Sequence, residues 1–490
     1  MTVCSTRPGR LAAALLAAGA LACAPASPGV SGGAAHPPTP ATPWQPGPGG
    51  EALSFPPKPP GAPEERNRPL TLPDFVDLAL ASNPATRVTW ASARAAAATY
   101  GSSRSEWFPR ITAEVDRTEL KTGGTQGRAA VQQSLFGPTA SFTWMLLDFG
   151  GRSGRIGVAR EALVAANWTH NAAIQDAVLR VGQAFYSFAA NRALVAAQLT
   201  SLAEADSNLA AAEERRRVGV ATIADVLQAR TAVEQARLAL EQAQGDLTAA
   251  RGSLAVSAGY APTAPFEVDV QADEAPIGVV ADSVDSLINT AMRSRPDLAA
   301  AAAAVAQAEA SQRTVRAARL PAITATGNLG RTYLSGVSGP RDTYTLQLGL
   351  SIPLFNGFGW DYDVRAAQAR TEAQAARAEL LSQQAGLAVF TDYYALRTAT
   401  ERVRTAEVLL TSAVQSAEAA GGRYRAGVGS LLELLTAENT LASARAQRIQ
   451  ARFFWRTALF QLAHDAGLLD TQGGARINVT ADSSRNGPSR

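Results

Sequence analysis

The stretch RRRVGVATIADVLQAR, residues 215–230, recurs as RYRAGVGSLLELLTAE at residues 423–438. Aligned, the two copies share a glycine, a hydroxyl residue and an acidic residue at matched positions, namely Gly219 and Gly427, Thr222 and Ser430, and Asp225 and Glu433. Glycine takes the positive φ that closes a helix C-terminus, and a threonine or serine followed three residues later by an acidic residue is typical of an N-cap with a capping box. Each copy therefore predicts a tight turn between two helices.

The repetition extends well beyond these turns. Asn83-Pro84 recurs as Arg295-Pro296, and Leu147-Asp148-Phe149-Gly150 recurs as Phe355-Asn356-Gly357. Self-similarity on this scale indicates one architectural unit made twice. The first unit is predicted over residues 70–260 and the second over residues 283–470, with a proline-rich linker at 261–282 and a disordered tail at 471–490.

Inside each unit the hydrophobic period changes. Residues 74–106 predict a helix that Pro109 ends. Strand-like alternation follows at 111–115 and 141–145 in the first unit and at 323–326 and 343–352 in the second, with Gly-rich loops expected near 119–135 and 331–341. Proline-free helical patterns then run over 153–217 and 361–425, and about 60 helical residues span roughly 90 Å.

The helix after each turn carries a seven-residue repeat. In the first unit the apolar positions are Val226, Val233, Leu240, Leu247 and Leu254, with Ala229, Ala236, Ala243 and Ala250 three residues after the first four. The second unit has Leu434, Leu441, Arg448, Trp455 and Leu462, with Ala437, Ala444, Ala451 and Ala458. This period predicts a left-handed coiled coil, and the alanines let the backbones approach closely.

The N-terminus has the layout of a secretory signal. Arg7 and Arg10 precede a short apolar run, and Ala22-Cys23 follows it. Residues 1–22 therefore predict a signal peptide, and Cys23 resembles the acylated first residue of a bacterial lipoprotein. Residues 23–69, rich in proline and glycine, cannot bury enough apolar surface to fold alone and predict a disordered tether behind the lipid anchor.

The composition excludes several function classes. The formal net charge of +3 is small for 490 residues, and no polybasic run suits a nucleic acid. With three histidines on separate segments and no phosphate-binding glycine loop, we expect no catalytic centre, no metal site and no cofactor. The chain is expected not to be an enzyme.

The ordered features together resemble the outer membrane efflux protein family, the TolC-like outer membrane factors. The resemblance rests on the two turn motifs, on Arg295-Pro296-Asp297-Leu298 and on Pro353-Leu354-Phe355-Asn356-Gly357. It implies a mainly α fold with a small β part: two structural repeats, a long α-helical coiled-coil barrel, and four transmembrane β-barrel strands per chain that make twelve in a homotrimer. Phe142, Trp144, Leu346, Leu348 and Leu350 are expected to set a lipid face and a lumen face on these strands.

The same resemblance implies a function and a site. The chain would be a passive outer-membrane channel, lipid-anchored and extending into the periplasm. It would join a periplasmic adaptor (membrane fusion) protein and an inner-membrane pump to export small molecules, namely drugs, toxic compounds or metal ions. The turn residues that would dock the adaptor are Gly219, Val220, Thr222, Gly427, Val428 and Ser430. Asp225, Tyr424 and Glu433 would narrow the periplasmic entrance, although a second acidic position found in some relatives is Thr436 here.

Two alternatives stay open from the sequence. One is the outer-membrane channel of a type I protein secretion system. The other, from a different class, is a periplasmic coiled-coil structural or adaptor protein. An adaptor would carry one hairpin and lipoyl-like β-domains, whereas this sequence has two hairpins, each paired with two strands.

Overall fold

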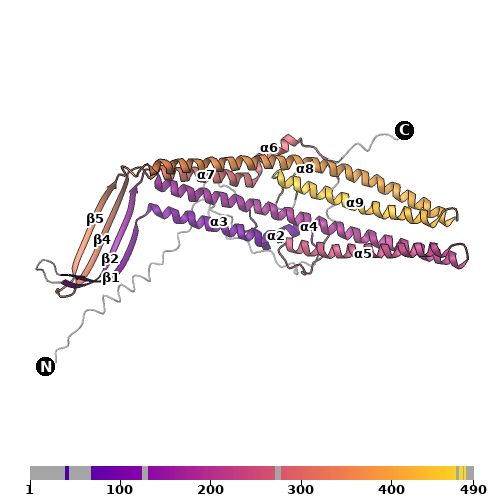
Figure 1. The fold of residues 1–490 in the computed structure, drawn as a ribbon, viewed down its shortest axis with the longest axis horizontal. Coiled ribbons are helices and arrows are strands. Elements are labelled where there is room, and N and C mark those ends of the chain that lie inside the picture. The colour runs from indigo at the N-terminus through magenta and orange to yellow at the C-terminus, as the bar shows by residue number, and fades with distance from the viewer. Residues whose placement is uncertain are drawn as a thin grey trace, which may run out of the picture.

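The computed structural model describes residues 39–42, 68–123, 131–270, 277–470, 474–477 and 479–481, which form a long rod with a sheet at one end and two helical hairpins at the other (Figure 1). The predicted signal peptide (1–22) and the predicted lipidation site, Cys23, lie outside the described residues. The same holds for most of the tether at 23–69.

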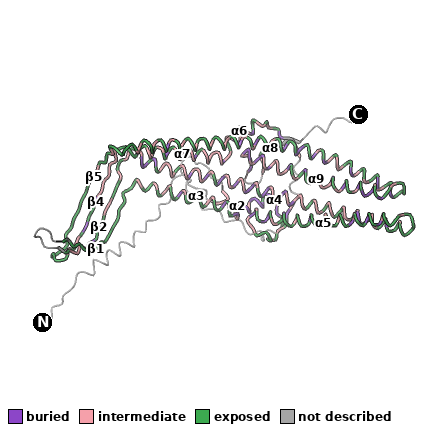
Figure 2. The backbone as a smooth tube through the Cα atoms, in the orientation of Figure 1, coloured by how far each residue is buried: buried purple, intermediate pink, exposed green. Residues whose placement is uncertain are grey.

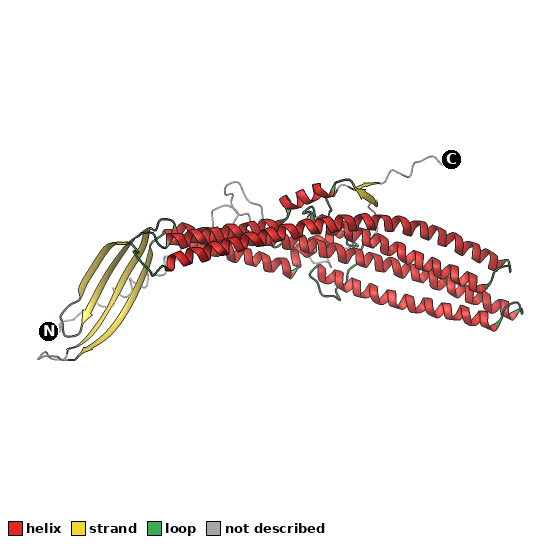
Figure 3. Ribbon diagram, turned by 45° about the horizontal axis from the view of Figure 1, so that its top comes forward, coloured by secondary structure: helices red, strands yellow, loops and turns green. Residues whose placement is uncertain are grey.

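Four antiparallel strands form the sheet (Figure 3), and their order is β1-β2-β4-β5 (Figure 1). They are β1 (Arg110–Thr122), β2 (Val131–Leu147), β4 (Ala322–Leu334) and β5 (Arg341–Ser351). In the register, Phe142 lies opposite Gly327, which lies opposite Leu346, and Trp144, Ala325 and Leu348 form the next row. Because side chains alternate between faces, these rows share one face.

The two faces of this sheet differ sharply in polarity. The apolar face includes Ile111, Val115, Phe142, Trp144, Leu329, Leu346, Leu348 and Leu350, and the opposite face carries Thr112, Glu114, Ser141, Thr324, Thr326, Asn328, Thr345 and Gln347. The predicted alternation is therefore confirmed. On the apolar side Leu346 is 76 % exposed and Leu348 is 70 % exposed in the single chain.

The strands are longer than the sequence predicts. The segments expected to be Gly-rich loops contain strand residues, because β1 and β2 pair as far as Thr122 and Val131, and β4 and β5 pair as far as Thr332 and Arg341. A strand ladder depends on main-chain hydrogen bonds, which polar pairs such as Lys121 and Gln132 satisfy as well as apolar ones do. Alternation of apolar and polar residues in the sequence reveals only the apolar centre of each strand.

Four helices build the hairpin end. The long helices α4 (Gly151–Arg217) and α8 (Gly359–Arg425) each have 67 residues and begin two residues before the predicted starts at 153 and 361. They turn into α5 (Ile223–Ser257) and α9 (Leu431–Asp465). Near the sheet the long helices pack instead against α3 (Pro84–Ser103) and α7 (Pro296–Ala317). Among the described residues, no helix combines the length and the apolar character that crossing a membrane requires.

The helix predicted over residues 74–106 is two helices. The structure has α2 (Leu72–Ser82), then α3, then a short 3-10 turn, η2 (Arg104–Trp107). Asn83 breaks the helix with an extended backbone, because the residue before a proline is pushed out of the helical region, and its side chain caps α3 by accepting from the Ala85 N–H at 2.8 Å. Arg295 is extended in the same way between α6 (Val284–Ser294) and α7.

A small second sheet joins the linker to the tail. Strand β3 (Gly278–Val280) pairs antiparallel with β6 (Val479–Ala481). Part of the segment expected to be a disordered tail is therefore a strand. Its partner comes from the linker, roughly 200 residues earlier, so local sequence carries no signal for the pairing.

The main core lies midway along the rod, where α2, α4, α8 and α9 meet, and buried residues gather there in Figure 2. Its largest fully buried side chains include Phe75, Phe185 and Trp455. Most of the predicted heptad positions are also buried, whereas Ala236, Leu247, Arg448 and Ala458 are only half-buried. The buried ones are Val226, Ala229, Val233, Leu240, Ala243, Ala250 and Leu254 in α5 and Leu434, Ala437, Leu441, Ala444, Ala451, Trp455 and Leu462 in α9.

A cluster of charged groups adjoins this core. His464 bonds Asp465 and Asp176 through its two ring nitrogens, both at 2.9 Å, and Arg295 lies 3.3 Å from Asp465. Burial lowers the pKa of His464, but the hydrogen bonds to Asp176 and Asp465 outweigh it and raise the pKa to about 9. Burial, together with the neighbouring Asp465 carboxylate, raises the pKa of Asp392 to about 8. The cluster therefore holds two protons near neutral pH.

Candidate functional site

The candidate site is the pair of helical turns at the end of the rod farthest from the sheet (Figure 1). Gly219 has φ 83° and Gly427 has φ 76°, as the turn motif predicts. Each turn closes with a long-range main-chain bond, from the Val220 N–H to the Arg215 carbonyl at 2.9 Å and from the Val428 N–H to the Arg423 carbonyl at 3.0 Å. This is the bond pattern of a Schellman helix end.

Both turns present apolar side chains to solvent. Val220 is 72 % exposed and Val428 is 71 % exposed, and Ile223 and Leu432 beside them are also exposed. A Cβ atom built on Gly219 or Gly427 would meet nothing within 4 Å. The tips are therefore bare, protruding and apolar, which suits the close approach of another chain.

The capping box of the first turn is complete. Thr222 Oγ1 accepts from the Asp225 N–H at 3.2 Å, and Asp225 Oδ2 accepts from the Thr222 N–H at 2.7 Å. These hydrogen bonds, the backbone one first, lower the pKa of Asp225 below its ordinary value. Asp225 therefore stays charged at the start of α5, where the helix dipole favours an anion.

The second turn departs from the predicted capping box. Ser430 caps α9 by accepting from the Glu433 N–H at 3.2 Å. The Glu433 carboxylate, however, pairs with Arg423 at 2.9 Å. Glutamate is one methylene longer than aspartate, so it reaches the neighbouring helix end. The two acidic residues thus occupy matched positions but make different contacts.

Tyr424 is buried between the two hairpins and is only 7 % exposed. Its ring packs in a small core with residues from both hairpins, namely Ala212, Val226, Ala229, Ala420, Leu431, Leu434, Leu435 and Ala437. The Arg215 guanidinium lies 4.0 Å from the ring centroid, and Arg215 Nη2 donates to the Tyr424 carbonyl at 2.6 Å. Arg215 therefore ties the end of α4 to the end of α8.

Two further polar contacts join the hairpins above this core. Arg445 of α9 makes a bidentate pair with Glu204 of α4, with both N···O distances at 2.9 Å, and Asn208 of α4 hydrogen-bonds Glu438 of α9. Burial first, and then the nearby Glu204 carboxylate, raise the pKa of Glu438. Together with the Arg215 contact, these contacts start from one side of α4, at positions 204, 208 and 215, since residues four and seven apart share a helix face.

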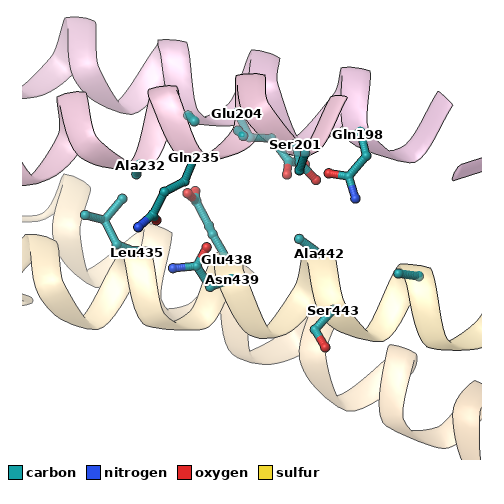
Figure 4. A pocket seen from close by; sticks show the side chains of 14 residues that line it. Gln198, Ser201, Glu204, Ala232, Gln235, Leu435, Glu438, Asn439, Ala442 and Ser443 are labelled. Atoms are coloured by element: carbon teal, nitrogen blue, oxygen red, sulfur yellow. The ribbon is translucent and has the colours of Figure 1, made fainter. Parts of the chain in front are cut away.

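A cavity of 230 Å³ lies among these contacts. Figure 4 shows side chains of α4 and α5, including Gln198, Ser201 and Gln235, facing Glu438 and Asn439 of α9 across it. Many of its lining residues are alanine, serine or amide side chains. The two hairpins are thus tightly packed within themselves but meet each other through a looser, polar seam.

The structure brings together the predicted gate residues Asp225, Tyr424 and Glu433 within the same pair of tips. Sequence reasoning missed Arg215 and Arg423, which stand at the same position of the two repeats. That repeated arginine was a usable signal. It also missed Glu204, Glu438 and Arg445, whose partners are more than 200 residues away. In the described part of the chain, no group of three or more His, Cys, Asp or Glu residues could hold a metal ion.

Comparisons with known proteins agree with this architecture. A family model described as "Outer membrane efflux protein" matches residues 75–260 and 287–468, which are the two repeats. Protein CyaE of Bordetella pertussis (strain Tohama I) is 30 % identical over 423 residues, covering 85 % of this chain and 88 % of that protein.

A second relative is the toluene efflux pump outer membrane protein TtgC of Pseudomonas putida. It is 26 % identical over 425 residues, covering 84 % of this chain and 85 % of its own length. Among solved structures, a membrane protein from Pseudomonas aeruginosa superposes with a TM-score of 0.72 at 24 % identity, covering 81 % of this chain and 93 % of that one. At that identity the likeness concerns the fold.

Proposed function

Because the chain belongs to the outer membrane efflux protein family, we propose that its two hairpin tips form the adaptor-docking and gating end of a channel that exports small organic molecules. The chain is the outer-membrane component of a tripartite efflux system. It works as a trimer with a periplasmic adaptor protein and an inner-membrane pump. Members of this family are passive channels, and the energy for export comes from the pump.

The sheet explains why one chain is not enough. The order β1-β2-β4-β5 leaves one edge of β1 and one edge of β5 without a partner among the described strands. Exposed strand edges demand pairing, and in lipid every main-chain polar group must be satisfied. Three copies pair these edges around a ring, and the polar face described above then lines the lumen while the apolar face contacts lipid.

The docking role is assigned to the exposed turns. Gly219, Val220 and Thr222 in the first turn, and Gly427, Val428 and Ser430 in the second, would meet the adaptor. The bare glycines and the two exposed valines are what support this proposal. Apolar side chains on a protruding tip gain free energy when a partner covers them.

The gating role is assigned to Asp225, Tyr424 and Glu433. The observation that carries it is the contact of Arg215 with Tyr424, because this contact joins the two hairpins at the tip. While it holds, the hairpins of one chain cannot separate there. Asp225 and Glu433 would add negative charge at the entrance, and neither carboxylate is buried in the single chain.

Small organic molecules are the proposed cargo, in part because a relative covering most of this chain is named for toluene efflux. Lipidation of Cys23 is proposed as a second anchor beside the strands. More than one buried acyl chain is needed for firm anchoring, at about 0.8 kcal/mol per CH₂ group. We also propose that this chain itself catalyses no reaction.

Dye accumulation in cells tests the cargo. A strain without this chain should accumulate a hydrophobic fluorescent dye, and the intact chain should lower the accumulation. The double variant Val220→Arg/Val428→Arg should fail to do so while still reaching the outer membrane as a trimer. If dye accumulation is the same with and without the chain, and the strain without it no longer releases a polypeptide into the culture medium, the protein secretion alternative is favoured.

A further inference from the structure

The apolar face of the sheet ends in charged side chains at the strand ends farthest from the helices (Figure 1). On β1 this face continues past Val115 with Arg117, Glu119 and Lys121, since side chains alternate and the register with β2 is unbroken. Arg117 Nη2 donates to Glu119 Oε1 at 3.0 Å, as expected for side chains on one face. Lys121 is exposed to solvent.

Strands β4 and β5 change in the same way at this end. Arg331 lies opposite Asp342, which is two residues from Tyr344 along β5. Arg331 Nε donates to Asp342 Oδ1 at 2.6 Å, and its Nη2 donates to Oδ2 at 2.9 Å. Nearby on the same face, the ring centroids of Phe136 and Tyr333 are 6.2 Å apart. Aromatic rings are enriched at the level where a membrane meets water.

The depth of these charges matches the outer edge of a bilayer. From Leu350 to Asp342 there are 8 residue steps (350 − 342), which span about 27 Å along the strand. At a strand tilt of about 40° this corresponds to roughly 21 Å of depth, and the apolar band of a membrane-spanning sheet is about 25 Å tall. The helices extend from the opposite end of the strands into the periplasm. The charges therefore lie at the level of the outer leaflet's headgroups.

We propose that Arg117, Lys121 and Arg331 form a cation belt that binds phosphate groups of the outer-leaflet lipid, an inference that rests on the lipid face of the proposed trimer. Arg331 keeps N–H groups for a phosphate, since a guanidinium has five and Asp342 takes two. Arg117 likewise gives only one to Glu119. Both ion pairs are exposed and contribute little stability, so a phosphate can join or displace the carboxylate. Three cations against two carboxylates leave an excess positive charge on this part of the face.

The closed ring of strands repeats the cation belt around the trimer. Its cations stand on β1 and β4, and β2 separates these two strands. When three copies close the ring, β5 of one copy lies beside β1 of the next, so every second strand carries a cation. Neighbouring strands are about 4.8 Å apart, so these strands recur about every 10 Å. Because such a belt contacts several phosphates of a lipid layer at once, it favours a lipid over a single soluble anion.

Lipid binding to the purified, delipidated trimer tests the cation belt, with native mass spectrometry as the measurement. The probe is lipid A that carries two phosphates, and the reference is the same lipid with both phosphates removed. We expect the natural trimer to bind the phosphorylated form at least about tenfold more tightly, because three cations per chain face its phosphates. The triple variant Arg117→Gln/Lys121→Gln/Arg331→Gln should lose this preference. Equal binding of the two lipids by the natural trimer, or an unchanged preference in the triple variant, would overturn the proposal.

Arg341 provides the matched control, because it lies at the same end of the sheet, next to Asp342, but on the polar face. Arg331→Gln should weaken binding of the phosphorylated lipid at least about threefold, whereas Arg341→Gln should leave it unchanged. Equal losses in the two variants would indicate attraction to overall charge and would overturn the cation belt. A loss confined to Arg341→Gln would overturn the proposed lipid face as well. Heat-modifiable migration on a gel verifies that each variant is an assembled trimer before binding is measured.

Discussion

Arg215 lies 4.0 Å above the ring of Tyr424 and donates a hydrogen bond to its carbonyl, which joins two hairpins that lie about 200 residues apart in sequence. Its counterpart in the second repeat, Arg423, instead pairs with Glu433 inside its own hairpin. The same arginine position thus makes different contacts in the two repeats. One arginine connects the hairpins, and the other stabilises a single tip.

This asymmetry predicts different effects for the two arginines. Arg215→Gln should cost about 1–3 kcal/mol of contact energy at the tip, since it removes a cation–π contact and a charge-assisted hydrogen bond. The hairpins should separate more easily, so single-channel conductance in a planar bilayer should rise. Arg423→Gln is the matched control and should leave conductance near that of the natural protein. Equal conductance changes in both variants would show that the contact between Arg215 and Tyr424 does not hold the hairpins together.

Neutralising the acidic residues separates gating from capping. Asp225→Asn should cost up to about 1 kcal/mol of stability, because the amide oxygen can still accept from the Thr222 N–H but the negative charge that the helix dipole favours is lost. Glu433→Gln should cost less than about 1 kcal/mol, because its pair with Arg423 is exposed. If both residues narrow the entrance, the double variant should raise conductance without the pump. A lower melting temperature with unchanged conductance would leave them as caps alone and remove them from the gate.

The glycine at the second tip should be needed for docking rather than for assembly. The Gly427→Trp side chain would not clash with the turn, since no atom lies within 4 Å of a Cβ built on Gly427. It would, however, place a large side chain where the adaptor must approach. Export should be lost while the trimer persists on a semi-denaturing gel. Gly427→Asn is the control, because asparagine tolerates a positive φ at a cost below the roughly 1–2 kcal/mol typical of other residues. Export that survives the tryptophan would remove Gly427 from the docking surface.

The two faces of the sheet should respond oppositely to charge. Leu348→Arg places a cation on the apolar face and should cost about 2–4 kcal/mol near the bilayer midplane. Gln347→Arg, one residue earlier, points to the polar face and should be tolerated. Yields of heat-modifiable trimer measure the difference. If both variants assembled equally well, the assignment of lipid and lumen faces would be wrong.

The charged cluster predicts a loss of stability in alkali. The pKa of Asp392 rises from 3.8 to about 8, and that of His464 rises from 6.5 to about 9. Both groups hold a proton in the folded state that the unfolded chain releases, so the free energy of unfolding falls as pH rises. The Asp392 contribution falls between pH 3.8 and about 8, and the His464 contribution is complete below pH 6.5 and is lost through about 9.

Melting temperatures of the purified trimer at pH 6.5 and 9 check this prediction. Between these two pH values the free energy of unfolding of the natural protein should fall by at least about 1 kcal/mol, which corresponds to a shift of roughly one pKa unit. Asp392→Asn mimics the protonated acid and should flatten the decline. Asp363→Asn, an exposed carboxylate on the same helix, should keep the natural profile. A decline that is identical in Asp392→Asn would exclude this carboxyl as a source.

Local chemistry in the sequence determined the two repeats, the long helices and their turns. Gly219 and Gly427 end their helices through a local property, since glycine adopts a positive φ freely. Thr222 and Ser430 cap the helices that follow them through an equally local hydrogen bond. The heptad positions and the alternation at Leu346, Leu348 and Leu350 likewise depend on periods that a few residues reveal.

Only the tertiary structure decided the contacts between distant segments. It showed that Arg215 rather than Arg423 reaches Tyr424 and that Glu204 and Arg445 face each other. It also showed where polar strand ends keep pairing. These outcomes depend on which helices and strands pack side by side, and that arrangement is set by the burial of the whole core rather than by the residues in any one window.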